Sequence, residues 1–266
     1  MTGARLWLIG CGNMGGAMLR RWIDSGVVAA ESVDVVNRAH RDLPAGVRQA
    51  RALPDGPLPD AVMLAMKPQQ LDEIAAAHAA RLAGVPLLIS ILAGVEEPAL
   101  AARFSAGGIV RAMPNLPVAI GKGVIALSSL SADAEARESV TALMAPLGLA
   151  EWIGDPRLFD AVTALAGCGP GFVYRFIDAL AGAGAALGLP ADQSARLALA
   201  TVEGSALLAA AADVDPATLA DRVASPGGST RAGLNVLDRA DGLAALLGET
   251  LAASERRNAE MAAAAR

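Results

Sequence analysis

The sequence predicts an α/β Rossmann-like doubly wound domain followed by an all-α helical dimerisation domain. Three observations lead to this prediction: short apolar runs alternate with amphipathic segments in the first half, a glycine-rich motif directly follows the first run, and strand patterns stop after about residue 155. The 266 residues suit two domains. We expect them at 1–155, for the Rossmann-like domain, and 156–266, for the helical domain.

The strands of the first half are expected where four or more apolar residues follow one another. Helical patterns separate these runs, which indicates a mostly parallel sheet covered on both faces. The expected strands are 6–9, 33–36, 61–66, 87–92, 109–113, 124–127 and, with a weaker pattern, 151–153.

The second half consists of helical patterns that are rich in alanine and glycine on several faces. Helices are expected at 160–187, 192–212, 216–223, from 231 to 247, and again after Gly248. A helix that is apolar around much of its circumference must be buried on more than one side, and so short a domain offers little interior. A homodimer in which the subunits exchange helices would supply the missing surface.

Composition excludes several classes of protein. The net charge of −5 and 3% aromatic content leave neither a basic stripe nor a stacking platform, so no nucleic acid partner is expected. Apolar stretches are interrupted before they reach membrane-spanning length, and no leader precedes the first strand, so a cytoplasmic protein is expected. The two cysteines and two histidines lack metal-ligand spacing, and no metal is expected.

The motif Gly10-Cys11-Gly12-Asn13-Met14-Gly15 lies between the first strand and the first helix. In that position the first glycine permits a tight turn, the second lets a pyrophosphate approach the backbone, and the third lets the helix pack on the strand. Phosphates would face the helix N-terminus. We interpret Gly10, Gly12, Asn13, Met14 and Gly15 as dinucleotide-binding residues, against the alternative of a chance glycine-rich turn.

The end of the second strand favours NADPH. An NAD site usually carries an acidic residue there, whereas this chain has Asn37 and Arg38, with Arg41 close behind. A planar, permanently charged guanidinium suits a 2′-phosphate, although a solvated surface arginine would give the same pattern. NADH is expected to serve only as a poorer alternative.

Further cofactor contacts are expected at the carboxyl ends of the next strands, where open α/β folds bind ligands. A cation near a helix N-terminus is electrostatically disfavoured, so an anionic neighbour is the preferred explanation of Lys67 over simple solvation. The side chain of Asn115 either binds the nicotinamide amide or stabilises the turn between two prolines. The positions assigned here to the cofactor are Ala65, Met66, Lys67, Pro68, Ala93 and Asn115.

The segment Ser225-Pro226-Gly227-Gly228-Ser229-Thr230 interrupts the helical half. Proline and two glycines stop one helix, and the restart of the next leaves free amide groups beside three hydroxyls. This combination suits a carboxylate, so Ser225, Gly227, Gly228, Ser229 and Thr230 are assigned to substrate binding. An ordinary capped loop between helices is the alternative.

These stretches together resemble the pyrroline-5-carboxylate reductases, which reduce a cyclic imine to proline. The resemblance spans nearly the whole chain and is carried by GCGNMG (10–15), AMKPQ (65–69), ISILAGV (89–95), RAMPNLPVAIGKGV (111–124), AGCGPGFVYRFIDAL (166–180), AGAALGLP (183–190) and VASPGGSTRAGL (223–234). The last of these, combined with the KPQ corner, is the most specific.

The resemblance implies an NADPH-binding Rossmann domain, a helical domain that interlocks with its partner's, and dimers that often build rings. It also implies that the 225–230 loop receives the substrate carboxylate and that Thr230, the expected catalytic residue, contacts the ring nitrogen. Cys168 stands where the family usually has serine and Leu116 where it has threonine. The 39–60 connection is shorter than the usual helix-bearing one, which leaves the adenosine side less defined.

Other functions compete with this interpretation. A β-hydroxyacid dehydrogenase would ordinarily need a catalytic lysine in the second domain, but no lysine follows residue 122. Another NADP-linked imine reductase shares the front half. A non-catalytic dinucleotide sensor has no need for a second carboxylate pocket, which the 225–230 loop suggests. Small-residue packing is the preferred explanation of Cys168, because imine reduction needs no covalent intermediate.

Overall fold

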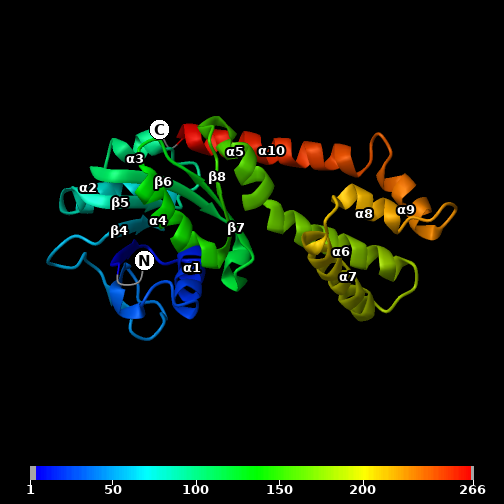
Figure 1. The fold of residues 1–266 in the computed structure, drawn as a ribbon, viewed down its shortest axis with the longest axis horizontal. Helices are drawn as coiled ribbons and strands as arrows, with labels where there is room; N and C mark the ends of the chain where they lie inside the picture. The colour runs from blue at the N-terminus through cyan, green and yellow to red at the C-terminus, as the bar shows by residue number, and fades with distance from the viewer. Residues whose placement is uncertain (1–3, 265–266) are drawn as a thin grey trace. The chain divides into compact units, whose positions relative to one another are not determined.

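The computed structural model describes residues 4–264 and confirms the predicted fold class, an α/β half followed by helices (Figure 1). Contacts divide the chain into two compact units. We call Met1–Cys168 with Ser254–Arg266 the sheet unit, and Gly169–Ala253 the helical unit. The functional boundary at 155/156 stays a prediction, since the contact division falls at Cys168 and returns the end of the chain to the sheet unit.

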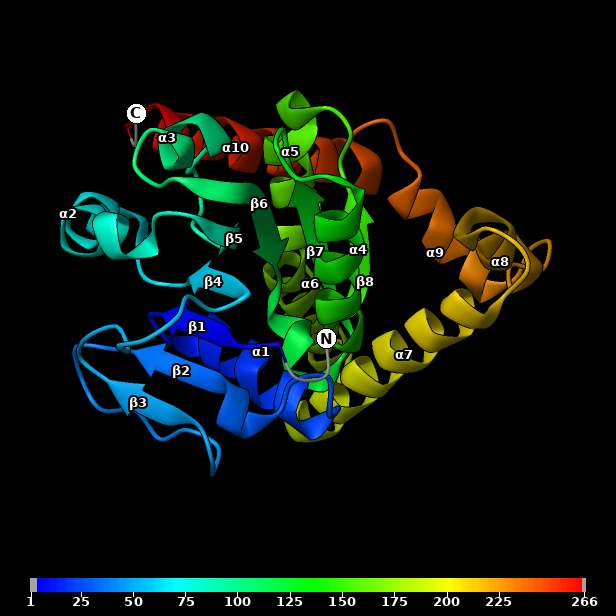
Figure 2. The ribbon, with the colours of Figure 1, turned by 60° about the vertical axis from the view of Figure 1, so that its left-hand side comes forward.

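The described residues of the sheet unit form one eight-stranded sheet in the order β3-β2-β1-β4-β5-β6-β7-β8, seen fanned out in Figure 2. Every neighbouring pair is parallel except β6 and β7. From β1 the strand order runs one way to β2 and β3 and the other way to β4 and the later strands. Open α/β sheets bind ligands at such a switch point, which here lies between β1 and β4. The strands are β1 Leu6–Ile9, β2 Val33–Val36, β3 Arg48–Ala50, β4 Ala61–Leu64, β5 Val85–Ser90, β6 Ala106–Pro114, β7 Gly123–Ser128 and β8 Gly148–Trp152.

Helices cover both faces of this sheet. Leu8 and Met63 pack on one face with α1 (Asn13–Asp24) and α4 (Ala134–Met144), while Trp7 and Leu64 pack on the other with α2 (Leu71–Leu82) and α3 (Glu97–Ala101). Because successive side chains of a strand point to opposite faces, two covered faces require the continuous apolar runs seen in the sequence. Short 3-10 turns complete the unit: η1 Ala30–Ser32, η2 Pro68–Gln70, η3 Leu116–Ile120, η4 Ala145–Leu147 and η5 Pro156–Leu158.

Strand β3, which pairs parallel to β2 at the edge of the sheet, was not predicted from the sequence. It has only three residues, Arg-Gln-Ala, and two of them are exposed. An edge strand of this length buries no apolar face, so the apolar pattern by which the other strands were predicted is missing.

The helices after β8 depart from the predicted boundaries at two places. The helix expected over 160–187 is interrupted by a π-helical segment at Thr163–Gly167. The break expected at Gly248 is wrong, because α10 runs through it, and the chain turns instead at 238–242. A side chain at Gly242 would lie 2.2 Å from the Leu237 carbonyl oxygen, so this turn needs glycine, whereas glycine within a helix costs only about 1 kcal/mol. The helices are α5 Phe159–Val162, α6 Gly169–Ala186, α7 Ala191–Ala211, α8 Pro216–Arg222, α9 Ser229–Leu237 and α10 Leu243–Ala264.

The helical unit buries little of its apolar surface within one chain. Its buried residues are Ser194, Ala198 and Ala224, all of them small, although α6 and α7 pack as an antiparallel pair. Large side chains such as Phe176 and Leu208 are exposed. Among the described residues, no single helix is both long and apolar enough to cross a membrane, and only the sharply bent pair of α7 and α8 meets the length and composition requirement together.

Candidate functional site

The glycine-rich loop after β1 has the geometry that a dinucleotide requires. Gly10 has φ of +85°, and a Cβ there would lie 2.6 Å from the Met66 amide nitrogen. A Cβ on Gly15 would lie 3.2 Å from the Ala65 Cβ, so α1 packs closely on the strand. A Cβ on Gly12 would meet no atom within 4 Å and would occupy open space above the loop. The residues present therefore fit a pyrophosphate lying against Gly12.

The N-terminus of α1 opens toward the same space. Gly12 is its N-cap, no side chain caps it, and its first turn carries no acidic residue. The early amide groups of such a helix have no intrahelical partner and attract anions. Asn13 lies at the surface of this turn, whereas Met14 is half-buried and packs against the core.

The carboxyl ends of the central strands meet at one edge of the sheet. The Gly10 amide donates to the Val36 carbonyl at 2.9 Å, and the Ala65 amide donates to the Ile9 carbonyl at 2.8 Å. The ladder therefore continues one residue beyond β1 and β4. This register brings the loop after β1 together with the loops after β2 and β4, as the sequence predicted.

A pocket of about 470 Å³ lies at this edge, within the size range of sites for small organic ligands. Six of the residues assigned to the cofactor line it, namely Gly10, Gly12, Asn37, Arg38, Met66 and Lys67. The sequence interpretation missed its other walls, which are formed by Arg51 after β3 and by Glu73, Ile74, Ala77 and His78 of α2. The four α2 residues are spaced so that they share one helix face, and this spacing could have predicted their place together. Arg51 could not have been predicted, because its position depends on β3. Burial lowers the pKa of His78.

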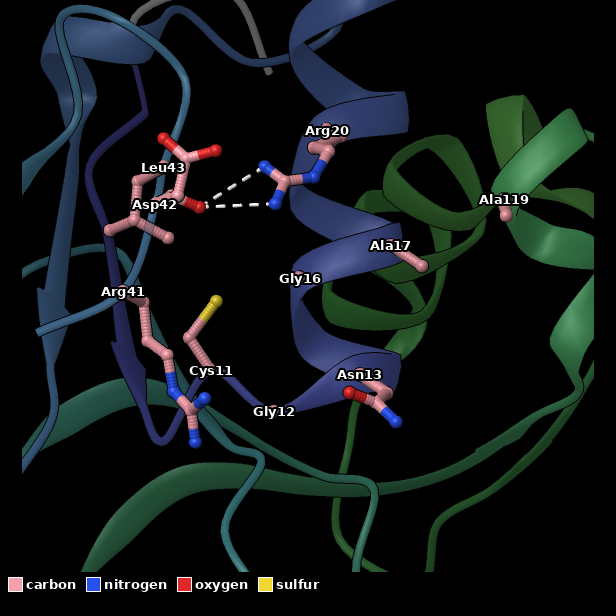
Figure 3. A pocket seen from close by; sticks show the side chains of 10 residues that line it. All are labelled: Cys11, Gly12, Asn13, Gly16, Ala17, Arg20, Arg41, Asp42, Leu43 and Ala119. Carbon is pink, nitrogen blue, oxygen red and sulfur yellow. Dashed lines mark hydrogen bonds between the residues drawn. The ribbon is translucent and has the colours of Figure 1, made fainter. Parts of the chain in front are cut away.

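A neighbouring pocket of about 490 Å³ lies between α1 and the segment after β2 (Figure 3). Arg20 of α1 donates two hydrogen bonds to the Asp42 carbonyl oxygen, at 3.3 and 3.0 Å, and so ties that segment to the helix. Cys11 points into this pocket, and burial raises the pKa of its thiol against the opposing effect of Arg20 and Arg41. The thiol is therefore kept protonated rather than activated.

Asn37 and Arg38 have partners within the chain. Asn37 accepts a hydrogen bond from the Cys11 amide at 2.8 Å, which joins the end of β2 to the glycine loop. Arg38 forms an exposed ion pair with Glu73 of α2. Asn37 thus shapes the loop, and the Arg38 charge is partly compensated.

The other cofactor positions differ in exposure. The Lys67 amide donates to the Gln70 side chain at 3.1 Å, and Pro68 begins the 3-10 turn η2 that leads into α2. Ala65 is half-buried beneath Gly15, and Ala93 is exposed in the loop after β5. The loops after β4 and β5 thus both place their backbone at the edge of the sheet where the parallel strands end.

Asn115 is buried at the end of β6. Its side-chain oxygen accepts from the Val124 amide at 2.9 Å, and its side-chain nitrogen donates to the Ala166 carbonyl of the π-helical segment, also at 2.9 Å. These bonds correspond to the turn-stabilising alternative. They extend it, since the same side chain holds the segment that precedes Cys168.

The 225–230 loop belongs to the helical unit and is a turn followed by a helix N-terminus. The Gly228 amide donates to the Ser225 carbonyl at 2.9 Å, and Gly227 has φ of +73°. Gly228 is the N-cap of α9, and no side chain caps it. Ser225, Ser229 and Thr230 are all exposed. The hydroxyls that suit a carboxylate are therefore accessible in the single chain, whereas the Gly228 amide is already bonded within the turn.

Comparison with known proteins extends the similarity over the full length. Residues 156–261 match the family model for pyrroline-5-carboxylate reductase dimerisation, and residues 5–94 match the model named NADP oxidoreductase coenzyme F420-dependent. The chain is 36% identical over 264 residues to a pyrroline-5-carboxylate reductase of Synechocystis sp., covering 97% of this chain and 98% of the relative. It is 32% identical over 282 residues to that of Pseudomonas aeruginosa, covering 98% of each.

Solved structures agree. A pyrroline-5-carboxylate reductase from Coxiella burnetii has a TM-score of 0.87 at 28% identity and covers 97% of this chain and 98% of its own. The Plasmodium falciparum pyrroline carboxylate reductase, solved with NADP bound, has a TM-score of 0.85 at 25% identity over 98% of this chain and 99% of its own. On sequence and fold together, this chain belongs to the pyrroline-5-carboxylate reductase family.

Proposed function

We propose that this protein is an NADPH-dependent oxidoreductase that reduces 1-pyrroline-5-carboxylate to L-proline, the last step of proline biosynthesis. The observation that carries the proposal is the dinucleotide geometry of the glycine loop, with open space at Gly12, in a chain related to these reductases over its full length. The reaction adds a hydride to the imine carbon and a proton to the nitrogen.

The cofactor would be held by the loop after β1 and the walls of the 470 Å³ pocket. The amides at the start of α1 would face the pyrophosphate, and Arg38 and Lys67 would supply positive charge near the phosphates. When bound, the reduced nicotinamide supplies the hydride. The remaining loops after β4, β5 and β6, with Ala65, Met66, Pro68, Ala93 and Asn115, would shape the nicotinamide side.

The substrate carboxylate would bind the 225–230 loop. The amides of Gly227 and Ser229 and the Ser225 hydroxyl offer donors to an anion, beside Gly228, whose own amide is bonded to the Ser225 carbonyl. The Thr230 hydroxyl would meet the ring nitrogen and orient the imine, and the nitrogen proton would come from solvent. Alignment of two bound reactants accounts for most of the required catalysis, so neither a triad nor a metal is needed.

The assembly we propose is a homodimer formed through the helical unit, with further association of dimers into a ring. The dimerisation match over 156–261 and the exposed apolar side chains of α6 and α7 support the dimer. The ring rests on resemblance to the family alone. A cytoplasmic location agrees with the two free cysteines, Cys11 and Cys168.

The decisive experiment follows the loss of NADPH absorbance with purified full-length protein and pyrroline-5-carboxylate. Piperideine carboxylate and NADH serve as comparisons. We expect rapid turnover with NADPH and the five-membered imine, slower turnover with NADH, and proline as the product. Turnover only with piperideine carboxylate would point to the alternative imine reductase, and cofactor binding with no turnover would point to a dinucleotide sensor.

A further inference from the structure

The unpredicted strand β3 adds an arginine to the wall of the 470 Å³ pocket at the ends of β1, β2 and β4. Three arginines line that pocket: Arg38 and Arg41 after β2, and Arg51 directly after β3. Glu73 is the single carboxylate among the lining residues that the structure describes. The pocket therefore has a net positive wall on the side where β2 and β3 end.

The three guanidinium groups are not equivalent. Arg38 is ion-paired with Glu73, whose charge opposes its own. Within residues 4–264, neither Arg41 nor Arg51 forms an ion pair. The Arg41 guanidinium lies beside the Cys11–Gly12 turn (Figure 3). A phosphate dianion entering the pocket would thus find two uncompensated arginines, and arginine is suited to bind phosphate through several hydrogen bonds.

Gln49, the central residue of β3, holds this basic segment in place. Its side-chain oxygen accepts from the Arg41 amide at 2.9 Å, and its side-chain nitrogen donates to the Arg41 carbonyl at 3.0 Å. The same oxygen accepts a longer bond, 3.4 Å, from the Asn37 side chain. The half-buried side chain of Gln49 thus holds both the backbone of Arg41 and the side chain of Asn37, which binds the Cys11 amide in the glycine loop.

The ladder between β2 and β3 places Arg51 as well. The Asn37 amide donates to the Ala50 carbonyl at 3.0 Å, so the chain leaves β3 next to the end of β2. The connection from 39 to 60 contains no helix. Near the pocket it consists of β3 and the turn that Gln49 holds, which together bring Arg41 and Arg51 to one pocket.

We infer that Arg41 and Arg51 form the binding site for the 2′-phosphate of the adenosine ribose, and that Gln49 is the residue that positions them. This inference rests on the proposed use of NADPH. It assigns coenzyme selection to the β3 side of the pocket, with Arg38 held by Glu73 as part of the wall. The ligand class is a phosphate monoester dianion next to an adenine nucleoside.

The test measures binding by calorimetry to the full-length protein, using 2′,5′-ADP and 5′-AMP as probes that differ by the one phosphate. Arg51→Ala and Arg41→Ala are each expected to weaken 2′,5′-ADP binding by about tenfold to a hundredfold, as for a lost hydrogen bond to a charged group, with a much smaller change for 5′-AMP. Gln49→Ala is expected to lower the ratio of the 2′,5′-ADP affinity to the 5′-AMP affinity by about fivefold. Arg256→Ala, which removes an exposed arginine outside both pockets, is the matched charge control and should leave the ratio unchanged.

Coenzyme kinetics separate this inference from the proposed function. The ratio of kcat/KM for NADPH to that for NADH should fall in the Arg51→Ala variant by a factor similar to the binding change. An unchanged ratio, or equal losses for both probes, would overturn the assignment to Arg41 and Arg51 while leaving the reductase activity in place. Absence of imine reduction by the unmodified protein would instead overturn the proposed function, and the two-probe binding comparison would still decide the phosphate site.

Discussion

The sheet unit buries its apolar side chains within one chain, whereas the helical unit leaves its large ones exposed. Trp22, Leu8 and Met63 are fully buried in the first, while the second buries only small residues and exposes side chains such as Phe176 and Leu208. Burial of apolar surface is the main favourable term in folding. The difference teaches that the sheet unit has an apolar core of its own, whereas we expect the helical unit to gain stability from a partner subunit.

The largest effect is expected from placing charges on the exposed apolar face of α7. Leu197 and Leu208 are both exposed and lie about three turns apart on one face of α7. In a two-fold dimer, Leu197→Asp with Leu208→Asp replaces four leucines that we expect the interface to bury, a loss of about 6 kcal/mol or more. We expect a monomer at micromolar concentration by light scattering, with reductase activity abolished and NADPH binding retained.

Leu130→Asp is the matched control, because Leu130 is at least as exposed as these two leucines but belongs to the sheet unit. It should keep the dimer. A wild-type protein that is monomeric at the same concentration, or a double variant that remains dimeric and active, would contradict the interpretation of the helical surface.

Within the sheet unit, two glycines of one motif should separate folding from binding. Gly10→Ala places a Cβ against the Met66 backbone at positive φ and should destabilise the protein by about 3 kcal/mol or more. Gly12→Ala meets open space at negative φ, so it should leave the melting temperature nearly unchanged. It should still weaken NADPH binding by about a hundredfold, because the Cβ stands where the pyrophosphate would lie.

Thermal unfolding and NADPH titration of both variants distinguish the two effects. If Gly12→Ala bound NADPH as tightly as the wild type, the pyrophosphate would have to lie elsewhere. Such a result would also remove the support that this loop gives to the proposed reductase.

In the helical unit, Thr230→Ala tests chemistry without touching packing, since Thr230 is exposed. Loss of a hydrogen bond to the ring nitrogen should reduce kcat/KM for pyrroline-5-carboxylate by about tenfold to a hundredfold. The melting temperature and NADPH affinity should stay the same, and Thr230→Ser should recover most of the loss. Steady-state kinetics that are identical for the alanine variant and the wild type would show that Thr230 has no role in turnover.

The smallest expected effect concerns the cap of α8. Asp215 accepts hydrogen bonds from the Thr218 amide at 3.0 Å and the Thr218 hydroxyl at 2.9 Å, and these bonds lower the pKa of its carboxyl. A lowered pKa means that the stabilisation is present above the unfolded-state pKa and is lost as the pH falls through the folded-state value. Asp215→Ala should lower the melting temperature slightly at neutral pH.

That difference from the wild type should shrink as the pH drops below about 4, the ordinary range of an aspartate. Asp213→Ala, which removes a nearby acid that caps no helix, should show no such pH dependence. A difference that stays constant to pH 3 would assign the effect to something other than the charged cap.

Much of the sheet unit was predictable because its rules are local. A buried parallel strand needs continuous apolar residues, so β1, β2 and β4 were found from Leu6–Ile9, Val33–Val36 and the start of Ala61–Met66. The same locality explains the motif after β1. Prediction from local pattern missed β3, because its residues are polar and show no sign of burial. It also placed a helix break at Gly248, where α10 continues despite the weak local preference of glycine against helix.

The sequence by itself determined the fold class, the family and the residue types available to two anion sites, because backbone limits and apolar periodicity act over a few residues. Tertiary structure alone decided which charges remain uncompensated. The pairing of Arg38 with Glu73 and the hold of Gln49 on Arg41 depend on β2, β3 and α2 coming together. Side chains separated along the chain become partners only when the sheet order brings those elements side by side, and no local pattern specifies that order.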